Sequence, residues 1–436
     1  MSRLRERLPI LLLFWGAFLL LHIACRSVNF QLKSPLCGIT VLFSLIYIFT
    51  PAKLRSLFAN GLLAVSTLYL TAAALDLLVR PWVIDRFYYR PEERFYTHWT
   101  RHDRIGRYAP LVDFKGTVYG DLAAMAQRPE WRDERQVRFQ TDRFGFRNED
   151  PRPTSPVSLF VLGDSAADGT GVTQPETVTS RLRALSSKPA YNLSIICIGP
   201  WGEYVNLISE WPRLPVGERP RIYWVLFTAN DMEDPCWPAS PEKIQWKTPW
   251  ERVRTRVQNI RRHSAISYFL LGLDQSVQGA KRQVIVKDFF GKPLLFFDVY
   301  RDEARRTARD LTRHRYMPDV QKSIQAMGAW AREHKVEVVV VSLSSKEQVY
   351  EWVLKDQKPW PTPAAPTPFF LAIQDICQKA GLKAIDLNPC LVKESKRLYE
   401  KTGELLWWRD DTHPNGQGHA AVARFIMELE RKRPKA

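Results

Sequence analysis

The sequence predicts an α/β fold in which helices cover both faces of a parallel sheet, preceded by transmembrane helices at the N-terminus. Short, continuous apolar runs recur along residues 155–430, and stretches with a helical pattern separate them. Such runs are typical of parallel strands, because crossover helices bury both faces of the sheet. A strongly apolar segment over residues 8–79 predicts the membrane part.

Composition narrows the class of protein. The chain has 436 residues, of which 45% are hydrophobic and 25% charged, as in a globular protein of two or three domains. Six cysteines are too few for a disulfide framework at this length. The net charge of +17 suits anionic lipid headgroups, acidic glycans or nucleic acid. Because the charge is scattered and no nucleic-acid motif accompanies it, nucleic acid is not an expected partner.

Three apolar stretches predict a membrane anchor over residues 1–80. They are Leu8–Cys25, Leu36–Phe49 and Leu57–Val79. A spanning helix needs about 20 apolar residues, so the first and third are long enough and the second is short. A signal peptide followed by buried core helices is the alternative.

Basic residues set the expected orientation. With three spans and the N-terminus inside, the cytoplasmic segments hold most of the flanking Lys and Arg. Residues 81–436 then lie outside the inner membrane, which in a bacterium is the periplasm. With two spans they are cytoplasmic, so the short second stretch decides the location.

The remaining chain divides into a connector and a larger domain. Residues 81–154 form the connector, with a short strand at Gln136–Thr141 and a turn at Asp142–Asn148. Residues 155–430 form the α/β domain, with an insertion at about 232–300 that contains an Arg-rich helix near Trp250–Arg262. The predicted strands are Val157–Leu162, Tyr191–Ile198, Ile222–Phe227, Val336–Leu343 and Lys383–Leu387. The predicted helices include Val178–Leu185, Pro318–His334 and Phe369–Ala380.

Polar residues follow the first three predicted strands. Gly163-Asp164-Ser165 follows the first, Gly199 to Gly202 the second, and Asn230-Asp231 the third. Asp410-Asp411-Thr412-His413 precedes the final helical stretch. Because ligands of parallel sheets bind at the carboxyl ends of the strands, these residues are expected to meet. Taken singly, each is also typical of an ordinary turn, helix cap or helix-entry loop.

Together and in this order, the four blocks resemble the SGNH, or GDSL-type, serine hydrolases over about residues 155–430. The Phe144–Asn148 turn and the Ser345–Tyr350 segment also look like membrane-anchored bacterial members. The resemblance implies a flavodoxin-like three-layer α/β/α domain. Two positions depart from the family pattern, with Ala166 in the first block and Thr228 in the third.

The resemblance also implies a catalytic set. Ser165 is the expected nucleophile, His413 its base, and Asp410 the residue that orients the imidazole. Asp411 is the rival for the last role, but the family's Asp stands three residues before the His. The expected oxyanion donors are the backbone N–H groups of Ser165 and Gly199 and the Asn230 amide, with Gly202 as the alternative to Gly199.

The function implied is that of a membrane-anchored esterase that hydrolyses or transfers O-acyl groups through an acyl-Ser165 intermediate. Acylated cell-surface glycans are the leading substrate by resemblance, and lipid esters come next. An O-acyltransferase of exopolysaccharide and a catalytically silent envelope scaffold remain alternatives. No cofactor is implied, and the cysteines show no metal pattern. A Cys377–Cys390 disulfide and the oligomeric state stay open.

Overall fold

The computed structural model places the larger part of the chain after residue 89. It describes residues 90–97, 106–150 except 127, 154–232, 284–355 except 290, 365–431 and the isolated positions 60, 71, 75 and 78. The predicted membrane stretches, isolated positions apart, and the predicted helix near Trp250–Arg262 lie outside these residues. Within them, no helix combines the length and the apolar character that crossing a bilayer requires.

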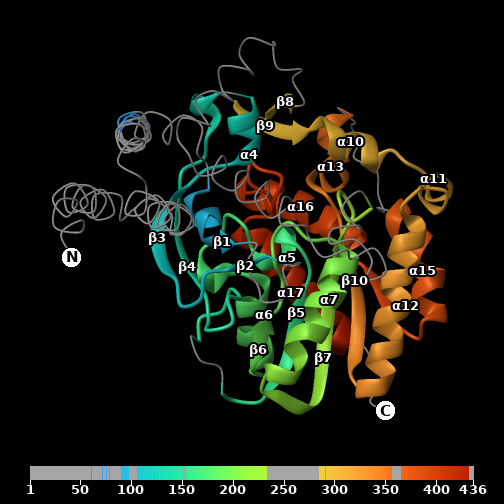
Figure 1. Cartoon of the computed structure of the whole chain (residues 1–436). Coiled ribbons are helices and arrows are strands. Elements are labelled where there is room, and N and C mark those ends of the chain that lie inside the picture. Colours follow the sequence, from blue (N-terminus) through green and yellow to red (C-terminus); the bar gives the residue numbers. More distant parts are fainter. Residues whose placement is uncertain are drawn as a thin grey trace, which may run out of the picture. The chain divides into compact units, whose positions relative to one another are not determined.

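A five-stranded sheet forms the centre of the described fold (Figure 1). Its strands are β5 (Val157–Leu162), β6 (Ala190–Asn192), β7 (Val216–Phe227), β10 (Glu337–Leu343) and β11 (Lys383–Asp386). All neighbours pair in parallel, in the order β11-β10-β7-β5-β6. Numbered along the chain, this is the 2-1-3-4-5 order of flavodoxin-like sheets, whose switch point lies between the first and third strands. The predicted parallel α/β sheet is confirmed.

Helices pack on both faces because side chains alternate along each strand. On β7, Ile222 and Trp224 belong to one buried cluster, whereas Tyr223 and Val225 belong to another. The first cluster includes residues of α7 (Pro200–Glu210), α12 (Met317–His334) and α15 (Pro368–Lys379). The second includes residues of α6 (Val178–Ser186), α16 (Asn388–Thr402) and α17 (Gly416–Arg431). The three predicted helices are thus present with nearly the expected bounds.

The second predicted strand is shorter than its apolar run. β6 ends at Asn192, whose side-chain oxygen accepts a hydrogen bond from the Ser194 N–H and turns the chain. Cys197 then takes a left-handed conformation with φ 60° and is exposed. The interpretation of Cys197 as a core residue was therefore wrong. No disulfide joins Cys377 to Cys390 in this structure.

The segment expected to be a connector packs against the sheet domain. Its elements are η2 (Pro91–Phe95), β1 (Tyr96–Thr97), β2 (Arg107–Tyr108), β3 (Asp113–Val118), α4 (Asp121–Met125), η3 (Pro129–Trp131) and β4 (Arg135–Gln140). β3 and β4 form an antiparallel pair, as do β1 and β2. Phe139 and Phe146 are buried in the same cluster as one face of the sheet. The described residues between 90 and 232 and between 284 and 431 accordingly belong to one compact unit.

The described end of the insertion forms a hairpin of β8 (Val284–Phe289) and β9 (Lys292–Phe297), followed by α10 (Asp298–Ala304). The Leu295 N–H donates to the carbonyl of Arg409, so the hairpin contacts the chain just before Asp410. The remaining short elements are α5 (Ser165–Asp168), η4 (Gln174–Glu176), η5 (Trp211–Arg213), α11 (Ala308–Thr312), α13 (Lys346–Val349) and α14 (Glu351–Leu354).

Candidate active site

Ser165 is the first residue of α5 and follows the carboxyl end of β5. Gly163 makes the close approach there, because a Cβ at this position would lie 2.7 Å from the Ala167 methyl and 2.8 Å from the Val225 carbonyl oxygen. The Asp164 side chain then caps the short helix by accepting the Ala166 N–H at 2.9 Å. Ser165 is thereby placed at the switch point of the sheet, where β5 adjoins β7.

His413 lies near the C-terminal end of the domain in sequence and contacts Ser165 in the structure. Its Nε2 atom lies 2.9 Å from the Ser165 Oγ atom, although 248 positions separate the two residues. The histidine stands in a loop between Trp407 and Pro414, which pair through an isolated bridge just before α17. The predicted contact between the hydroxyl and the imidazole is therefore present in the structure.

The carboxylate against the imidazole is Asp411, and the expectation of Asp410 in that place was wrong. The Asp411 Oδ1 atom lies 2.9 Å from His413 Nδ1 and also accepts the His413 backbone N–H at 3.0 Å. The second bond forms a tight turn, which brings a carboxylate two residues before the histidine onto its ring. The spacing of three residues expected from the family pattern does not apply here.

Asp410 faces the opposite way and anchors the loop to the segment around α4. Its Oδ2 atom accepts the backbone N–H groups of Gly120 at 2.8 Å and Asp133 at 3.0 Å. Its carbonyl accepts the N–H groups of Leu122 and Ala123 in the first turn of α4. A Cβ at Gly120 would overlap the Asp410 carbonyl, so only glycine permits this approach.

Two arginines separate the roles of the neighbouring carboxylates. The Arg90 Nη2 atom lies 2.7 Å from Asp411 Oδ1, and Arg135 contacts Asp411 Oδ2 at 3.1 Å and also pairs with Asp410. Burial alone would raise the pKa of Asp411, but Arg90, the His413 ring and Arg135 hold it well below its usual range. Burial raises the pKa of Asp410 to about 6, against the opposing effect of Arg135. Asp411 is thus the member of the pair whose charged form the surroundings favour.

The Nδ1 atom of His413 also lies 3.0 Å from Arg90 Nη2. A ring with its proton on Nδ1 donates to Asp411 and leaves the Nε2 lone pair facing Ser165. A ring with its proton on Nε2 accepts from Arg90 instead and has no base facing the hydroxyl. The low pKa of Asp411 favours the first tautomer, because a charged carboxylate is the stronger acceptor.

Asp121 completes the surroundings of the histidine. It accepts the Thr412 N–H and hydroxyl at 3.0 and 2.7 Å and lies 3.2 Å from Arg90 Nη2. Asp121, Asp411 and His413 each offer an atom within 4.8 Å of the others, a spacing compatible with a metal ion. The Arg90 Nη2 atom already contacts the same three groups, so a guanidinium supplies the positive charge there.

The predicted oxyanion donors stand at the same edge of the sheet. Gly199 is the N-cap of α7, whereas Gly202 lies within its first turn. Asn230 follows β7 and donates through Nδ2 to Asp164 Oδ2 at 3.1 Å. One of its two amide N–H groups is thereby used, which ties the amide to Asp164, the residue before Ser165. That Ser165, Gly199 and Asn230 bind an oxyanion stays a prediction.

Four residues of the site were absent from the predicted set: Arg90, Asp121, Arg135 and Lys346. The first three belong to the segment expected to be a connector, whose local pattern gave no sign of a role in the site. Lys346 falls in the Ser345–Tyr350 segment, which the family resemblance had marked without a role. Its ammonium contacts the Trp408–Asp411 backbone.

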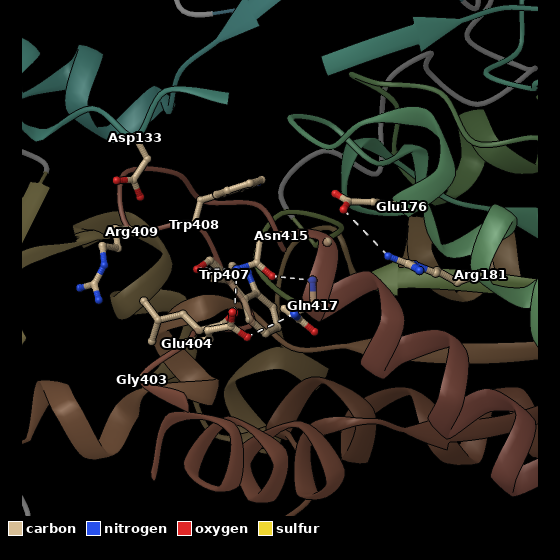
Figure 2. Close-up of a pocket in the computed structure, with 12 residues that line it drawn as sticks. Asp133, Glu176, Arg181, Gly403, Glu404, Trp407, Trp408, Arg409, Asn415 and Gln417 are labelled. Atoms are coloured by element: carbon tan, nitrogen blue, oxygen red, sulfur yellow. Dashed lines mark hydrogen bonds and ion pairs between the residues drawn. The ribbon is translucent and has the colours of Figure 1, made fainter. Parts of the chain in front are cut away.

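A cavity of about 380 Å³ adjoins the loop that carries Asp411 and His413 (Figure 2). Its walls combine two indoles with carboxylates, guanidinium groups and amides. The side chains that line it include those of Asp133, Glu176, Arg181, Glu404, Trp407, Trp408, Arg409, Asn415 and Gln417. Three carboxylates and two arginines leave the wall close to electrically neutral.

No family model and no curated protein matches the chain. Among solved structures, a lipolytic G-D-S-L family member from Veillonella parvula is 12% identical, with a TM-score of 0.30, and the match covers 64% of this chain and all of that one. A Bacillus subtilis protein is 12% identical, with a TM-score of 0.32 and 69% coverage of each chain. An acetyl xylan esterase from Butyrivibrio proteoclasticus is 10% identical, with a TM-score of 0.29 and coverage of 69% and 74%. Likeness at this level carries no argument about activity, which must come from the geometry.

Proposed function

We propose that the protein is a serine esterase in which Ser165 is the nucleophile, His413 the general base and Asp411 the carboxylate that orients the base. The observation that carries the proposal is the line of contacts from Ser165 Oγ to His413 Nε2 and from His413 Nδ1 to Asp411 Oδ1, each 2.9 Å long. This is the arrangement that activates a hydroxyl, since the base takes the proton as the oxygen attacks.

In the acylation step, Ser165 Oγ attacks the ester carbonyl while its proton moves to His413 Nε2. The imidazolium that forms is stabilised by Asp411 and returns the proton to the leaving alcohol. Water then attacks the acyl-serine by the same route in reverse. The N–H groups of Ser165 and Gly199 and the Asn230 amide are the proposed donors to the oxyanion, where one donor contributes about 10²–10³ in rate.

We propose acylated glycans as the substrate class. The basis is the cavity beside the loop that carries Asp411 and His413, called the catalytic loop below. Indole rings next to planar polar side chains are typical of sugar sites, because rings pack on sugar C–H faces while polar groups bind hydroxyls. The half-buried Trp408 and the exposed Gln417 supply the two kinds of group. The nearly balanced charge of the wall favours a neutral saccharide over the phosphate of a lipid ester.

Membrane anchoring through residues 1–80 is proposed from the three apolar stretches alone. A periplasmic position for the active site follows only if all three stretches span the membrane. Reporter fusions at about residue 85 would test it, since a periplasmic reporter should be active and a cytoplasmic one silent. The opposite pattern would place the site in the cytoplasm.

The O-acyltransferase alternative uses the same residues and differs only in whether a sugar hydroxyl or water accepts the acyl group. Product analysis in the presence of an acceptor glycan distinguishes them. Transfer leaves the total number of ester groups unchanged, whereas hydrolysis lowers it. A silent scaffold, in contrast, requires that the Ser165 hydroxyl be unreactive.

The test of the proposal uses the full chain, a fluorophosphonate probe and a small acetyl ester. Wild type should be labelled on Ser165 and turn the ester over, whereas Ser165→Ala and His413→Ala should do neither, because each removes part of one unit. Ser158→Ala, on β5 before the site, is the matched control and should behave as wild type. A folded wild-type chain that neither labels nor turns over any ester would support the scaffold instead.

Arg181→Ala and Gln417→Ala test the substrate class. Both residues line the cavity and neither contacts the triad. Each should lower kcat/KM for an acetylated oligosaccharide while leaving turnover of the small ester unchanged. Equal effects on the two substrates, or none on either, would exclude the cavity as the sugar site.

A further inference from the structure

Lys346 is a fully buried cation directly behind the catalytic loop. It follows β10 at the carboxyl edge of the sheet and is the first residue of α13. Its side chain has no exposed area, and its Nζ atom lies 5.5 Å from the centre of the Phe296 ring on β9. Burying an ammonium costs several kcal/mol unless its surroundings compensate the charge. An apolar side chain would fill the same space without that cost.

The compensation comes from the backbone of the catalytic loop. The Nζ atom donates to the carbonyl oxygens of Trp408 at 2.6 Å, Arg409 at 2.9 Å and Asp411 at 3.2 Å. An ammonium has three N–H donors, so three acceptors match its full capacity. Three carbonyl oxygens that converge on one point repel each other, and a cation at that point removes the repulsion. The turn at residues 408–411 is therefore built around Lys346.

This turn fixes the direction of the Asp411 side chain. The Asp411 carbonyl points back to Lys346, while its carboxylate points forward to the His413 ring. On the other side of the loop, Asp410 is tied to α4 and Arg135. With both sides held, the peptide between residues 410 and 411 cannot rotate to exchange the two carboxylates.

Resting on the proposed esterase function, we propose that Lys346 is a positioning residue for the reaction, whose ammonium holds three loop carbonyls so that Asp411 faces His413. It touches neither the substrate nor the reacting atoms. Its removal should relax the loop and lengthen the Asp411–His413 bond, and misplacement by about 1 Å can cost ~10² in rate.

The alkaline limb of the pH profile gives a readout that a merely structural role would not move. Burial lowers the pKa of Lys346 to about 8, although Glu347 on its own helix, Asp410 and Asp411 on the loop and Asp121 on α4 oppose the shift. The neutral amine has only two N–H groups for three carbonyls, so turnover should fall above this pH. Stability should not fall with it: between about 8 and the usual 10.5 the unfolded lysine binds more protons, so this group's contribution to folding stability rises with pH.

The experiment compares Lys346→Met with Lys396→Met, which alters another buried lysine, on α16. Lys346→Met should lower kcat for the small acetyl ester about 10²-fold, leave KM within twofold and remove the alkaline limb. Lys396→Met should keep the wild-type kcat and the limb. If Lys346→Met fails to fold, Lys346→Gln takes its place in the same comparison. The fall of the wild-type kcat at alkaline pH is then the second readout.

A spectroscopic readout separates this inference from the proposed function. The downfield proton signal of His413 Nδ1–H reports its bond to Asp411 whether or not any ester is turned over. Its loss in Lys346→Met but not in Lys396→Met would support the positioning role even in a protein without turnover. An unchanged signal and kcat in Lys346→Met, or a wild-type kcat that stays level from pH 8 to 10, would overturn the inference.

Discussion

The parallel sheet and the segment from Arg90 to Asn148 contribute to one site in different ways. The sheet places Ser165 by local rules, since a buried strand, a glycine and a capping aspartate follow one another in the sequence. The segment acts over long separations in sequence, because Arg90 and Arg135 pair with a carboxylate 321 and 276 residues further on. The sheet thus positions Ser165, the proposed nucleophile, whereas the segment determines which carboxylate contacts the His413 ring.

Among the substitutions that test this comparison, Arg135→Met should lower the free energy of unfolding most. Arg135 is 3% exposed and pairs with both Asp410 and Asp411. Removing one partner of a buried ion pair leaves an uncompensated charge and typically costs about 3–5 kcal/mol. Urea denaturation should show this loss. The control is Arg138→Met on the same strand, whose pair with Asp113 is exposed and which should change stability little. Similar effects of the two substitutions would show that the buried pairs do not hold the loop.

Gly120→Ala should have the next largest effect. The added methyl would overlap the Asp410 carbonyl, which is fixed by two N–H groups of α4. Overpacking of this kind costs about 1–3 kcal/mol, and ester turnover should fall as the loop shifts. Gly116→Ala on β3 is the control, because there the three atoms nearest the added methyl belong to a side chain, the Phe114 ring, whereas at Gly120 they include the backbone of Asp410. Wild-type turnover in Gly120→Ala would separate the α4 contact from the position of Asp411.

Cys197→Gly tests the sheet side of the comparison and should raise the free energy of unfolding slightly. Cys197 holds a left-handed φ of 60°, which costs a non-glycine residue about 1–2 kcal/mol. Glycine removes that strain but adds chain entropy to the unfolded state, so a net stabilisation below about 1 kcal/mol is expected. Thermal unfolding would show it as a slightly higher Tm. A lower Tm would mean that the thiol makes contacts worth more than the strain.

The fold was predictable because it follows from local pattern. The β5 run has the predicted bounds. Each end of α6, α12 and α15 lies within one residue of its predicted position. The apolar run after Asn192 misled the prediction, because the Asn192 side chain ends the strand while the residues beyond it stay buried in a loop. Hydrophobicity reports burial, and it cannot separate a buried strand from a buried turn.

The site was predictable as far as Ser165 and His413, which the structure brings into contact. The carboxylate that contacts the His413 ring was not predictable, because Asp410 and Asp411 are chemically identical neighbours. Their roles differ through Gly120, Arg90 and Arg135, which approach from distant parts of the chain. A family spacing carries no information about such contacts, so it selected the wrong member of the pair.

The most direct test of the account compares Asp411→Asn with Asp410→Asn in the full chain, by the rate of fluorophosphonate labelling of Ser165 and by kcat for a small acetyl ester. Asp411→Asn should lose about 10⁴ in kcat, because the amide favours the wrong imidazole tautomer. Asp410→Asn should lose stability, since Arg135 forfeits a charged partner, yet its folded fraction should label much faster than Asp411→Asn. A loss of labelling in folded Asp410→Asn, with Asp411→Asn close to wild type, would contradict the assignment of Asp411 as the residue that orients His413.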